Sequence, residues 1–511
     1  MTTPPASMRL CGNLVHTLLE AAAALPTKTA VIEAEGASTW ADLAARAQAV
    51  ATALADSGIR PGDRVAIFLP RGAGAVASFF GVLGAGAIAV IVNETLRPRQ
   101  IEHILNHSTA RLLLTIPAMM DRLPRAVETT ASLVSLSDIP ASGTSEPAPR
   151  VDGDIAHIVY TSGSTGLPKG VTISHGNLRA GAQSVVGYLG ITEDDRIASL
   201  LPFSFDYGLS QLLCAAQTGA TLVVEPSPVP QRIVRTLRAH EVTVLPAVPP
   251  LWQQLLNVEA FRAERLLSLR IMTNTGGRLS TDAVRVLREC QPQARLFLMY
   301  GLTEAFRSTY LSPSRADRKP NSIGQAIPGA EILVLDEELA PCRPGEIGEL
   351  VHRGPTVALG YWNDPEATAR VFRPHPLRPP GTPDAERVVF SGDLVYRDEE
   401  GDLFFVGRRD TMIKTLGYRV SPDEVVDVLH ASGEVVEAIV TGEPDALRGS
   451  QVVAYVVLRE DGDLERLRAF SARELPRYMQ PSRFEVRPAL RRTPSGKYDA
   501  AATVRDGHDP G

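Results

Sequence analysis

The chain alternates helical patterns with short apolar strands. Trp40–Gly58 has apolar side chains at helical spacing and ends on a glycine, which is typical of an amphipathic helix. Arg64–Pro70, RVAIFLP, follows as a buried strand. Similar apolar runs occur at Ala110–Thr115, Ala220–Glu225 and Val242–Pro249. Helices that alternate with apolar strands predict an α/β fold built from layers with largely parallel sheets.

One apolar segment, Gly72–Val92, carries no charge and is long enough to span a bilayer. However, it contains five glycines and ends in a β-branched run. This pattern favours a short buried helix at Val76–Leu83, a turn at Gly84–Gly86 and a buried strand. We therefore expect no membrane insertion.

Two polar stretches rich in proline separate the predicted elements. Pro140–Asp154 is predicted to be a linker before the strand IAHIVYT, and Arg373–Arg387 is predicted to be a surface loop. After Gly407–Val420 the pattern changes to a small α+β unit of about a hundred residues, a usual domain size. The sequence therefore predicts an N-terminal domain at residues 1–409 and a C-terminal domain at residues 410–511. The predicted C-terminal elements are helices at Ser421–Ala431 and Leu464–Leu475 and strands at Val435–Gly442 and Gln451–Leu458.

Composition supports a multidomain globular protein. A chain of 511 residues exceeds the size at which single cores stop growing. The net charge of −6 gives no electrostatic footprint for nucleic acid. The start of the chain lacks the basic region and cleavage site of a signal peptide, which predicts a cytoplasmic protein. The four cysteines are too scattered for a disulfide framework or a zinc site: Cys11, Cys214, Cys290 and Cys342.

A short loop, TSGSTGLPKG, combines hydroxyl groups, glycines and one lysine. Glycines permit positive φ angles and close backbone approach, so successive backbone N–H groups can form a nest for phosphate. The loop is not a Walker A sequence, and its alternative is a flexible Gly/Ser turn. Its position after a strand, with Pro168-Lys169-Gly170 closing it, favours an anion site. The candidate phosphate-binding residues are Thr161, Ser162, Gly163, Ser164, Thr165, Gly166 and Lys169.

This loop resembles the signature of the adenylate-forming superfamily, which includes acyl- and aryl-CoA synthetases, adenylation domains of nonribosomal peptide synthesis and beetle luciferases. Later stretches resemble the family's other motifs in the family's order, and the likeness extends from about residue 30 to residue 500. The resemblance implies a large multi-sheet N-terminal domain and a small mobile C-terminal domain, here called the lid. The later motifs are Met299–Ala305, Gly348–Pro365, Ser391–Leu394, Gly407–Val420 and Arg492–Asp499.

The implied reaction uses ATP and Mg²⁺. A carboxylate attacks the α-phosphorus of ATP and pyrophosphate leaves, a step that depends on positioning and charge neutralisation. The acyl adenylate would then pass to a thiol of CoA or a phosphopantetheine carrier, as in an acyl-CoA synthetase of specialised metabolism. Alternatives are transfer to an amine, activation of a small inorganic acid and, less favoured, a luciferase-like oxygenase. A binding protein without activity would be expected to lose Lys497, Glu304 or Asp393.

The resemblance also implies roles for individual residues. Thr303 and Glu304 would act in catalysis, with Glu304 as the Mg²⁺ ligand, and Lys497 would bridge the acid's carboxylate and the α-phosphate. Asp410 matches the lid's hinge and Gly417 the thiol channel. The family often has an acidic residue after the two glycines of the adenine site, where this chain has Arg278. The implied AMP-binding residues are Asn274, Gly276, Gly277, Tyr300, Gly301, Asp393, Phe405 and Arg408.

The identity of the acid depends on few residues. Asp206 falls where amino-acid-activating members keep an Asp for the substrate ammonium, and a buried Arg307 would suit a second carboxylate bidentately. Alternatively, the two residues pair with each other and the pocket is otherwise apolar. The predicted pocket residues are Phe205, Asp206, Val248, Met272, Met299, Arg307 and Ser308.

The acceptor and the assembly stay open at this point. No carrier domain follows Gly511 in this sequence, so we expect CoA or a separate carrier protein to accept the acyl group. The expected partners are therefore a small acid and a thiol, without nucleic acid, and the chain is expected to be a monomer or a homodimer.

Overall fold

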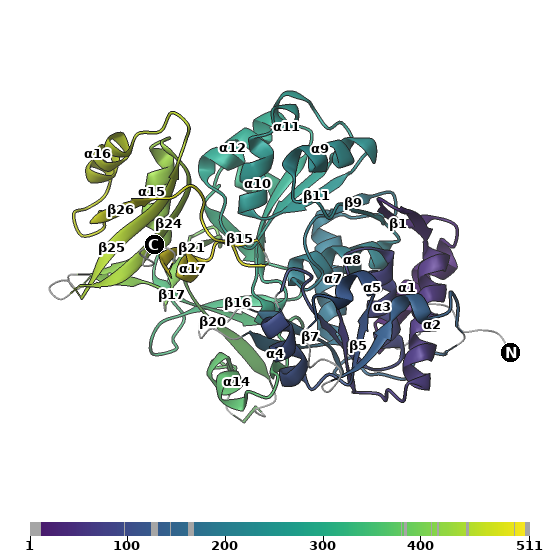
Figure 1. Cartoon of the computed structure of the whole chain (residues 1–511). Coiled ribbons are helices and arrows are strands. Elements are labelled where there is room, and N and C mark those ends of the chain that lie inside the picture. Colours follow the sequence, from purple (N-terminus) through teal and green to yellow (C-terminus); the bar gives the residue numbers. More distant parts are fainter. Residues whose placement is uncertain are drawn as a thin grey trace.

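The computed structural model shows alternating layers of sheets and helices, with a smaller unit formed by the C-terminal part of the chain (Figure 1). The structure describes residues 12–505 apart from 97, 124–130, 144, 162–167, 380, 383–385, 410, 416–417, 446–448 and 495.

The first sheet has seven strands in the order β18-β8-β7-β4-β3-β5-β6. Its strands from β7 to β6 run parallel, whereas β8 and β18 are antiparallel to their neighbours. The strands are β3 (Arg64–Ile67), β4 (Ile88–Ile91), β5 (Leu112–Thr115), β6 (Ser132–Ser135), β7 (Ile155–Thr161), β8 (Lys169–Ser174) and β18 (Gly360–Tyr361).

The second sheet has fourteen strands, and only one half of it is parallel. The parallel strands are β1 (Thr29–Glu33), β9 (Arg196–Ser199), β10 (Thr221–Val224), β11 (Val244–Ala247), β12 (Ile271–Asn274) and β13 (Arg295–Tyr300). The antiparallel strands are β2 (Gly36–Thr39), β14 (Thr309–Leu311), β15 (Ser322–Ala326), β16 (Glu331–Leu335), β17 (Ile347–Arg353), β19 (Phe372–Pro374), β20 (Arg387–Arg397) and β21 (Leu403–Arg408).

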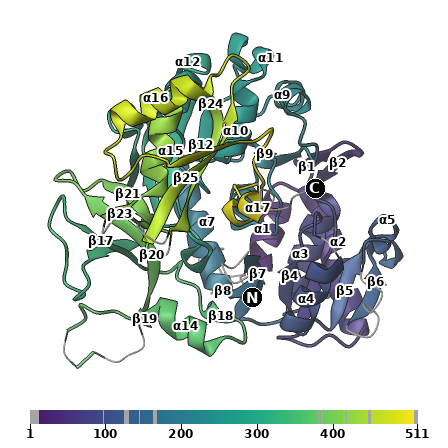
Figure 2. The same ribbon diagram turned by 60° about the vertical axis from the view of Figure 1, so that its left-hand side comes forward.

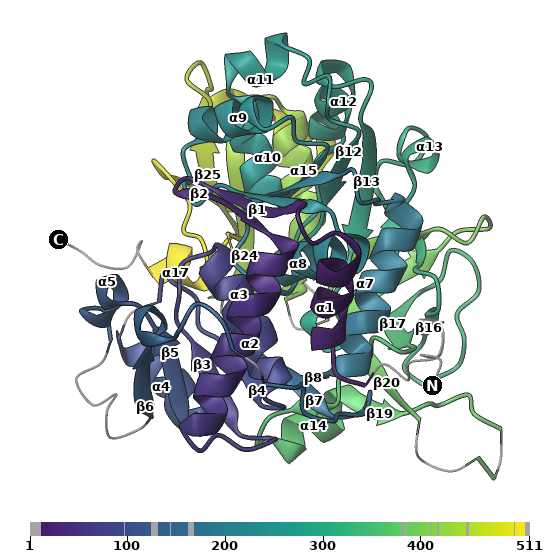
Figure 3. The same cartoon turned by 90° about the vertical axis from the view of Figure 1, so that its right-hand side faces the viewer.

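One group of helices lies between the two sheets, because a single apolar cluster joins these helices to both sheets (Figure 3). Other helices cover the outer faces, α4 on the first sheet and α9 to α12 on the second. The inner helices are α1 (Val15–Ala24), α2 (Trp40–Asp56), α3 (Ala73–Gly84), α7 (His175–Leu189) and α8 (Asp206–Thr218). The outer helices are α4 (Pro98–Ser108), α9 (Pro230–Ala239), α10 (Pro249–Leu256), α11 (Glu259–Ala263) and α12 (Thr281–Cys290). Short helices complete this part: α5 (Pro117–Met120), η2 (Leu136–Asp138), η3 (Thr303–Ala305), α13 (Pro313–Ala316) and α14 (Pro365–Val371).

The lid has its own core and two small sheets (Figure 2). Its predicted helices and strands are confirmed, with β24 and β25 as a long antiparallel pair. The proposed boundary between residues 409 and 410 stays a prediction, since Asp410 is not among the residues described. The lid elements are β22 (Ile413–Thr415), β23 (Tyr418–Val420), α15 (Pro422–Ala431), β24 (Val435–Asp445), β25 (Gly449–Leu458), α16 (Leu464–Glu474), β26 (Arg483–Val486) and α17 (Ala500–Arg505).

The uncharged segment forms the buried helix α3 and the strand β4, as predicted, although α3 begins three residues earlier than the predicted Val76. Almost all of its side chains are buried, and Gly81 permits close packing on α2. A Cβ on Gly81 would lie 2.6 Å from Cβ of Val50. None of the helices in the described ranges is long and apolar enough to cross a membrane.

Two sequence predictions need correction. The run Val242–Pro249 is not one strand, because β11 ends at Ala247 and α10 begins at Pro249, where proline suits the first helical turn. The loop predicted at Arg373–Arg387 includes residues of β19 and the first residue of β20. The antiparallel half of the second sheet was also not predicted.

Candidate active site

The candidate site lies where the parallel strands β11, β12 and β13 end. The carboxyl ends of neighbouring parallel strands meet at one edge of a sheet, which is where open α/β sheets bind ligands. Val248 follows β11, Asn274 ends β12 and Tyr300 ends β13. Because β11, β12 and β13 are neighbours in the sheet, three segments that are separated in the sequence lie side by side.

The predicted adenine wall forms a tight loop after β12. Asn274 donates from Nδ2 to the carbonyl oxygen of Gly277 at 2.9 Å. Gly276 has a φ angle of +79°, which disfavours any side chain there. Oδ1 of Asn274 is buried without a hydrogen-bond partner among the described residues, so an acceptor is left for a ligand's N–H group.

Tyr300 and Arg408 both contact Asp393. The Tyr300 hydroxyl donates to Oδ2 of Asp393, and Nη1 of Arg408 lies 3.2 Å from Oδ1. Burial, together with the Asp393 carboxylate, raises the pKa of Tyr300 well above its ordinary value, so the hydroxyl keeps its proton. Phe405 packs against Tyr300 with a ring separation of 6.5 Å. Four predicted AMP-binding residues, which come from β13, β20 and β21, therefore form one connected group: Tyr300, Asp393, Phe405 and Arg408.

Glu304, in η3, is held by Tyr361 of the edge strand β18, a tyrosine for which the sequence indicated no role. The Tyr361 hydroxyl donates to Oε1 of Glu304 at 2.6 Å. Burial, with Glu304 next to it, raises the pKa of Tyr361. Nζ of Lys169, at the end of the predicted phosphate loop, lies 5.6 Å from the centre of the Tyr361 ring. The predicted metal ligand and the predicted phosphate-binding lysine thus both contact Tyr361, Glu304 at its hydroxyl and Lys169 over its ring.

The residues present fit a magnesium ion that is held mostly by substrate. No group of three or more His, Cys, Asp or Glu side chains suited to a metal occurs in the described ranges. Mg²⁺ usually takes one or two carboxylates plus phosphate oxygens and water rather than a cage of protein ligands. Glu304 would supply that carboxylate, and the bound ion would neutralise phosphate charge.

The lid brings Lys497 into this site. Its Nζ lies 5.4 Å from the centre of the Phe205 ring, and a Cβ on Gly276 would lie 3.2 Å from Cε of Lys497. The turn that carries Lys497 is closed by a bond from its backbone N–H to Oγ1 of Thr493 at 3.2 Å. Asn93 donates to the carbonyl oxygen of Pro494 at 3.4 Å. The lid is therefore closed over the candidate adenine and acid sites.

Arg278 contacts the lid. Its Nη1 forms an ion pair with Oδ2 of Asp427 on α15, and the two side chains are 30% and 35% exposed. The position after Gly276-Gly277 therefore joins the adenine wall to the lid, which explains why a basic residue is suitable there.

We expect Arg278→Ala to slow adenylation roughly two- to fivefold at low salt, as for a part-exposed ion pair of up to about 1 kcal/mol. Arg278→Asp should slow it more, and the exchanged pair Arg278→Asp/Asp427→Arg should recover most of the rate. Pyrophosphate exchange at low and high salt measures this. Persistence of the full effect at about 1 M salt would contradict it, since screening then acts within about 3 Å.

The predicted acid-binding residues gather beside Phe205, with one exception. Phe205, Val248 and Met299 pack on one apolar cluster, and the Phe205 ring lies edge-on to Tyr207 at 6.3 Å. Met272 instead belongs to the cluster on the opposite face of β12. Side chains alternate along a strand, so its neighbour Thr273 faces the site, where its hydroxyl forms a hydrogen bond with the Tyr207 hydroxyl.

Ser308 is buried in a hydrogen-bonded chain that supports the neighbouring Arg307. Oγ of Ser308 lies 2.8 Å from Nδ1 of His352, and Nε2 of His352 lies 3.0 Å from Oγ1 of Thr356. Thr356 in turn donates to the carbonyl oxygen of Arg307 at 3.3 Å. Burial lowers the pKa of His352 to about 4, so the ring is neutral and can accept from Ser308.

Several predicted residues lie outside the described ranges: Ser162, Gly163, Ser164, Thr165, Gly166, Asp410 and Gly417. Their roles stay predictions. Two residues of the predicted phosphate loop, Thr161 and Lys169, are described. They face each other in the antiparallel pair of β7 and β8. Thr303 precedes Glu304 in η3, and Gly301 lies close to the backbone of Arg307.

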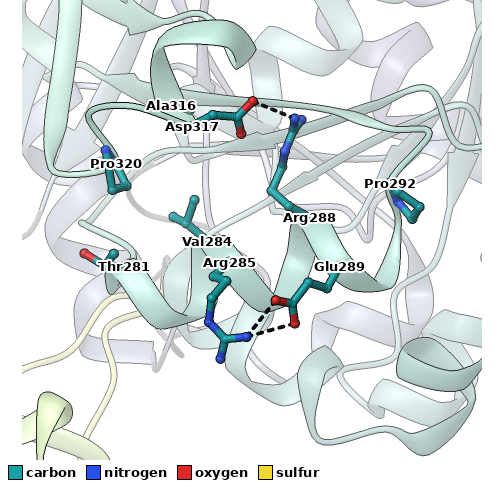
Figure 4. Close-up of a pocket in the computed structure, with 9 residues that line it drawn as sticks. All are labelled: Thr281, Val284, Arg285, Arg288, Glu289, Pro292, Ala316, Asp317 and Pro320. Atoms are coloured by element: carbon teal, nitrogen blue, oxygen red, sulfur yellow. Dashed lines mark hydrogen bonds and ion pairs between the residues drawn. The ribbon is translucent and has the colours of Figure 1, made fainter.

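A hollow of about 390 Å³ on α12 and α13 lies apart from these residues (Figure 4). Arg285 pairs there with Glu289, and Arg288 pairs with Asp317. Its charges are already compensated, and it contains none of the predicted site residues.

Known proteins share both this fold and these segments. Residues 18–362 match the AMP-binding enzyme family, and residues 424–497 match its C-terminal domain. Novobiocin biosynthesis protein H of Streptomyces niveus is 32% identical over 93% of this chain and 80% of its own length. The long-chain-fatty-acid–CoA ligase of Bacillus subtilis is 28% identical over 95% and 93%.

Two solved structures are similar over nearly their whole length. An anthranilate CoA ligase in complex with anthranoyl-AMP has a TM-score of 0.88, with 26% identity over 99% of both chains. The o-succinylbenzoate CoA synthetase of Bacillus subtilis in complex with its acyl-adenylate intermediate has a TM-score of 0.86, with 29% identity over 98% of this chain and 99% of that one. The chain therefore belongs to the AMP-binding enzyme family, the adenylate-forming superfamily of AMP-forming acid ligases.

Proposed function

We propose that this protein is an acid–thiol ligase whose residues form an acyl adenylate from ATP and a carboxylic acid and then transfer the acyl group to CoA or a carrier thiol. The observation that carries the proposal is the position of Lys497, next to Phe205 and Gly276 in the closed lid. An ammonium group there can contact two anions, the carboxylate of the acid and the α-phosphate. It would reduce their repulsion and stabilise the charge that develops during attack.

The remaining residues support binding and orientation. Asp393 offers a buried carboxylate to ribose hydroxyls, and Arg408 next to it can donate to sugar or phosphate. The Asn274 loop offers a flat wall and a free acceptor for adenine. Glu304, held by Tyr361, offers the carboxylate for Mg²⁺. In the thiol step, relatives such as the fatty-acid–CoA ligase support CoA as the acceptor, and a carrier thiol is the alternative.

ATP–pyrophosphate exchange tests the adenylation step. We expect at least one acid in an aliphatic, aromatic and amino-acid panel to support exchange, and a chelator such as EDTA to abolish it. Addition of CoA or a phosphopantetheinylated carrier should then convert the active acid to a thioester, detected by mass spectrometry. If no acid in the panel gave exchange or AMP release with a folded protein, the proposal would be wrong.

A further inference from the structure

Arg307 is the most unusual charged side chain near the site. Its side chain is 2% exposed. A fully buried arginine is almost always paired with another group. The preceding residue, Phe306, has a φ angle of +50°, a conformation that non-glycine residues rarely adopt. Its ring packs on Gly181 of α7, where a Cβ would lie 2.3 Å from Cδ1 of Phe306. The backbone is thus held in a strained turn that directs Arg307 inward.

The guanidinium is fixed on one side. Nη1 donates to the carbonyl oxygen of Phe306 at 2.9 Å. Two rings flank the group, with Cζ 5.1 Å from the centre of the Tyr207 ring and 5.3 Å from that of Phe306. Asp206 is the neighbouring acid, but its Oδ2 is 3.9 Å from Nη1, which is too long for a hydrogen bond. Its Oδ1 accepts the backbone N–H of Tyr207 at 2.7 Å.

The other edge of the guanidinium lacks a hydrogen-bond partner among the described residues. Nε and Nη2 are buried and make no hydrogen bond with any residue in the described part of the chain. These two nitrogens form one side of the planar guanidinium, and their N–H bonds point in parallel, which is a geometry that matches the two oxygens of a carboxylate. A buried donor without an acceptor is costly, and two on one group indicate a missing partner.

A series of ring contacts connects Arg307 to Lys497. The ring of Tyr207, which flanks Arg307, lies edge-on to Phe205, and Lys497 lies over Phe205. Gln211, one helical turn after Tyr207 on α8, also has both amide atoms buried without a partner. A second polar group of an acid held at Lys497 can therefore lie on the same side of α8 as Tyr207 and Arg307.

We propose that the substrate is a dicarboxylic acid: one carboxylate is activated beside Lys497, and the second is bound by the Nε/Nη2 edge of Arg307. This inference rests on the proposed function and narrows its substrate class. A bound carboxylate would satisfy both open N–H groups at once and would replace the distant Asp206 as the main partner of the guanidinium.

Matched pairs of acids test this. Each pair consists of a dicarboxylic acid and its monoamide, over a range of chain lengths and with an aromatic set. We expect kcat/KM for pyrophosphate exchange to be higher for the best diacid than for its monoamide, on the order of 10²-fold or more, because a site built for a polar group rejects analogues that lack it.

Variants at Arg307 separate recognition from folding. Arg307→Lys keeps the charge and loses the parallel donors, and Arg307→Met removes both, so the diacid preference should fall to within roughly tenfold in Arg307→Met. The matched control is Arg270→Lys, whose arginine pairs with Asp195 at the opposite end of β12 and should leave the preference unchanged. Should Arg307→Met fail to fold, melting curves of the unmodified protein with ATP and each acid give the same ranking.

Two results would overturn the inference. If monoacids support exchange and diacids show no advantage, Arg307 does not bind a second carboxylate. The proposed adenylation function would be unaffected by this result. If Arg307 and Asp206 only neutralise each other, Asp206→Asn and Arg307→Met should each lower the melting temperature and weaken all acids alike. The double variant would then recover part of the loss without a change in ranking, as coupled sites do. Lack of exchange with every acid would instead contradict the proposed function itself.

Discussion

Lys497→Ala should lower the rate of adenylation by about 10²–10³-fold, the usual effect of removing one electrostatic donor from a transition state. The charge of Lys497 is needed when two anions approach each other, so ATP binding in the absence of acid should change little. The closed lid supports this expectation, since Nζ lies over Phe205 and the turn at Thr493 fixes the backbone. Rapid-quench measurement of acyl-adenylate formation gives the rate directly.

A second variant separates charge from packing. Lys497→Met keeps an apolar stem over the Phe205 ring and loses only the charge, so it should be as slow as Lys497→Ala. Thioester formation from a supplied acyl adenylate should survive in both variants, because the phosphate bond has then already been made. An equal loss in both half-reactions would show that Lys497 has another role. Recovery of the rate in Lys497→Met would show that packing, not charge, is required.

Local sequence patterns predicted the elements whose signals are local. The helix at Trp40 begins with Thr39 and Asp42, which cap each other's backbone groups, so its start is encoded within four residues. The uncharged segment was assigned to a buried helix because its glycines and β-branched end contradict a membrane span. Burial of α3 between the two sheets explains its lack of charge.

Features that depend on distant contacts were not predictable in the same way. Tyr361 reaches Glu304 across 57 positions of sequence, and no periodicity marks it. Arg278 departs from the family's pattern, and its partner Asp427 lies on the lid, so the reason is visible only in three dimensions. Met272 was predicted to line the pocket, whereas the strand's alternation places Thr273 there. The antiparallel strands β14 to β21 lack the helix alternation that indicated the parallel part.

The structure distinguishes between two interpretations of Asp206 and Arg307 that the sequence supports equally, namely a mutual ion pair and the binding of substrate charges. A simple buried ion pair predicts short contacts that satisfy both groups. The structure has a single contact of 3.9 Å and two open donors on the arginine. This geometry favours a ligand for Arg307, while the prediction that Asp206 binds an ammonium group stays a prediction.

Asp393→Asn should weaken ATP binding by about 2–5 kcal/mol, which is roughly 30- to 4,000-fold, as expected when one partner of buried charged hydrogen bonds is replaced. Asp393 is buried, and its two oxygens already contact Tyr300 and Arg408, so the carboxylate is oriented before the nucleotide arrives. Calorimetric titration with ATP measures the affinity.

Tyr300→Phe is the matched control for Asp393→Asn, because it removes one hydrogen bond to Asp393 and leaves the carboxylate. Its expected loss in ATP affinity is about 1 kcal/mol. Arg408 is 49% exposed and can be solvated when Asp393 is neutral, so the melting temperature of Asp393→Asn should change little compared with ATP affinity. The opposite result, a lower melting temperature with unchanged ATP affinity, would mean that Asp393 holds Tyr300 and Arg408 in place and does not bind the nucleotide.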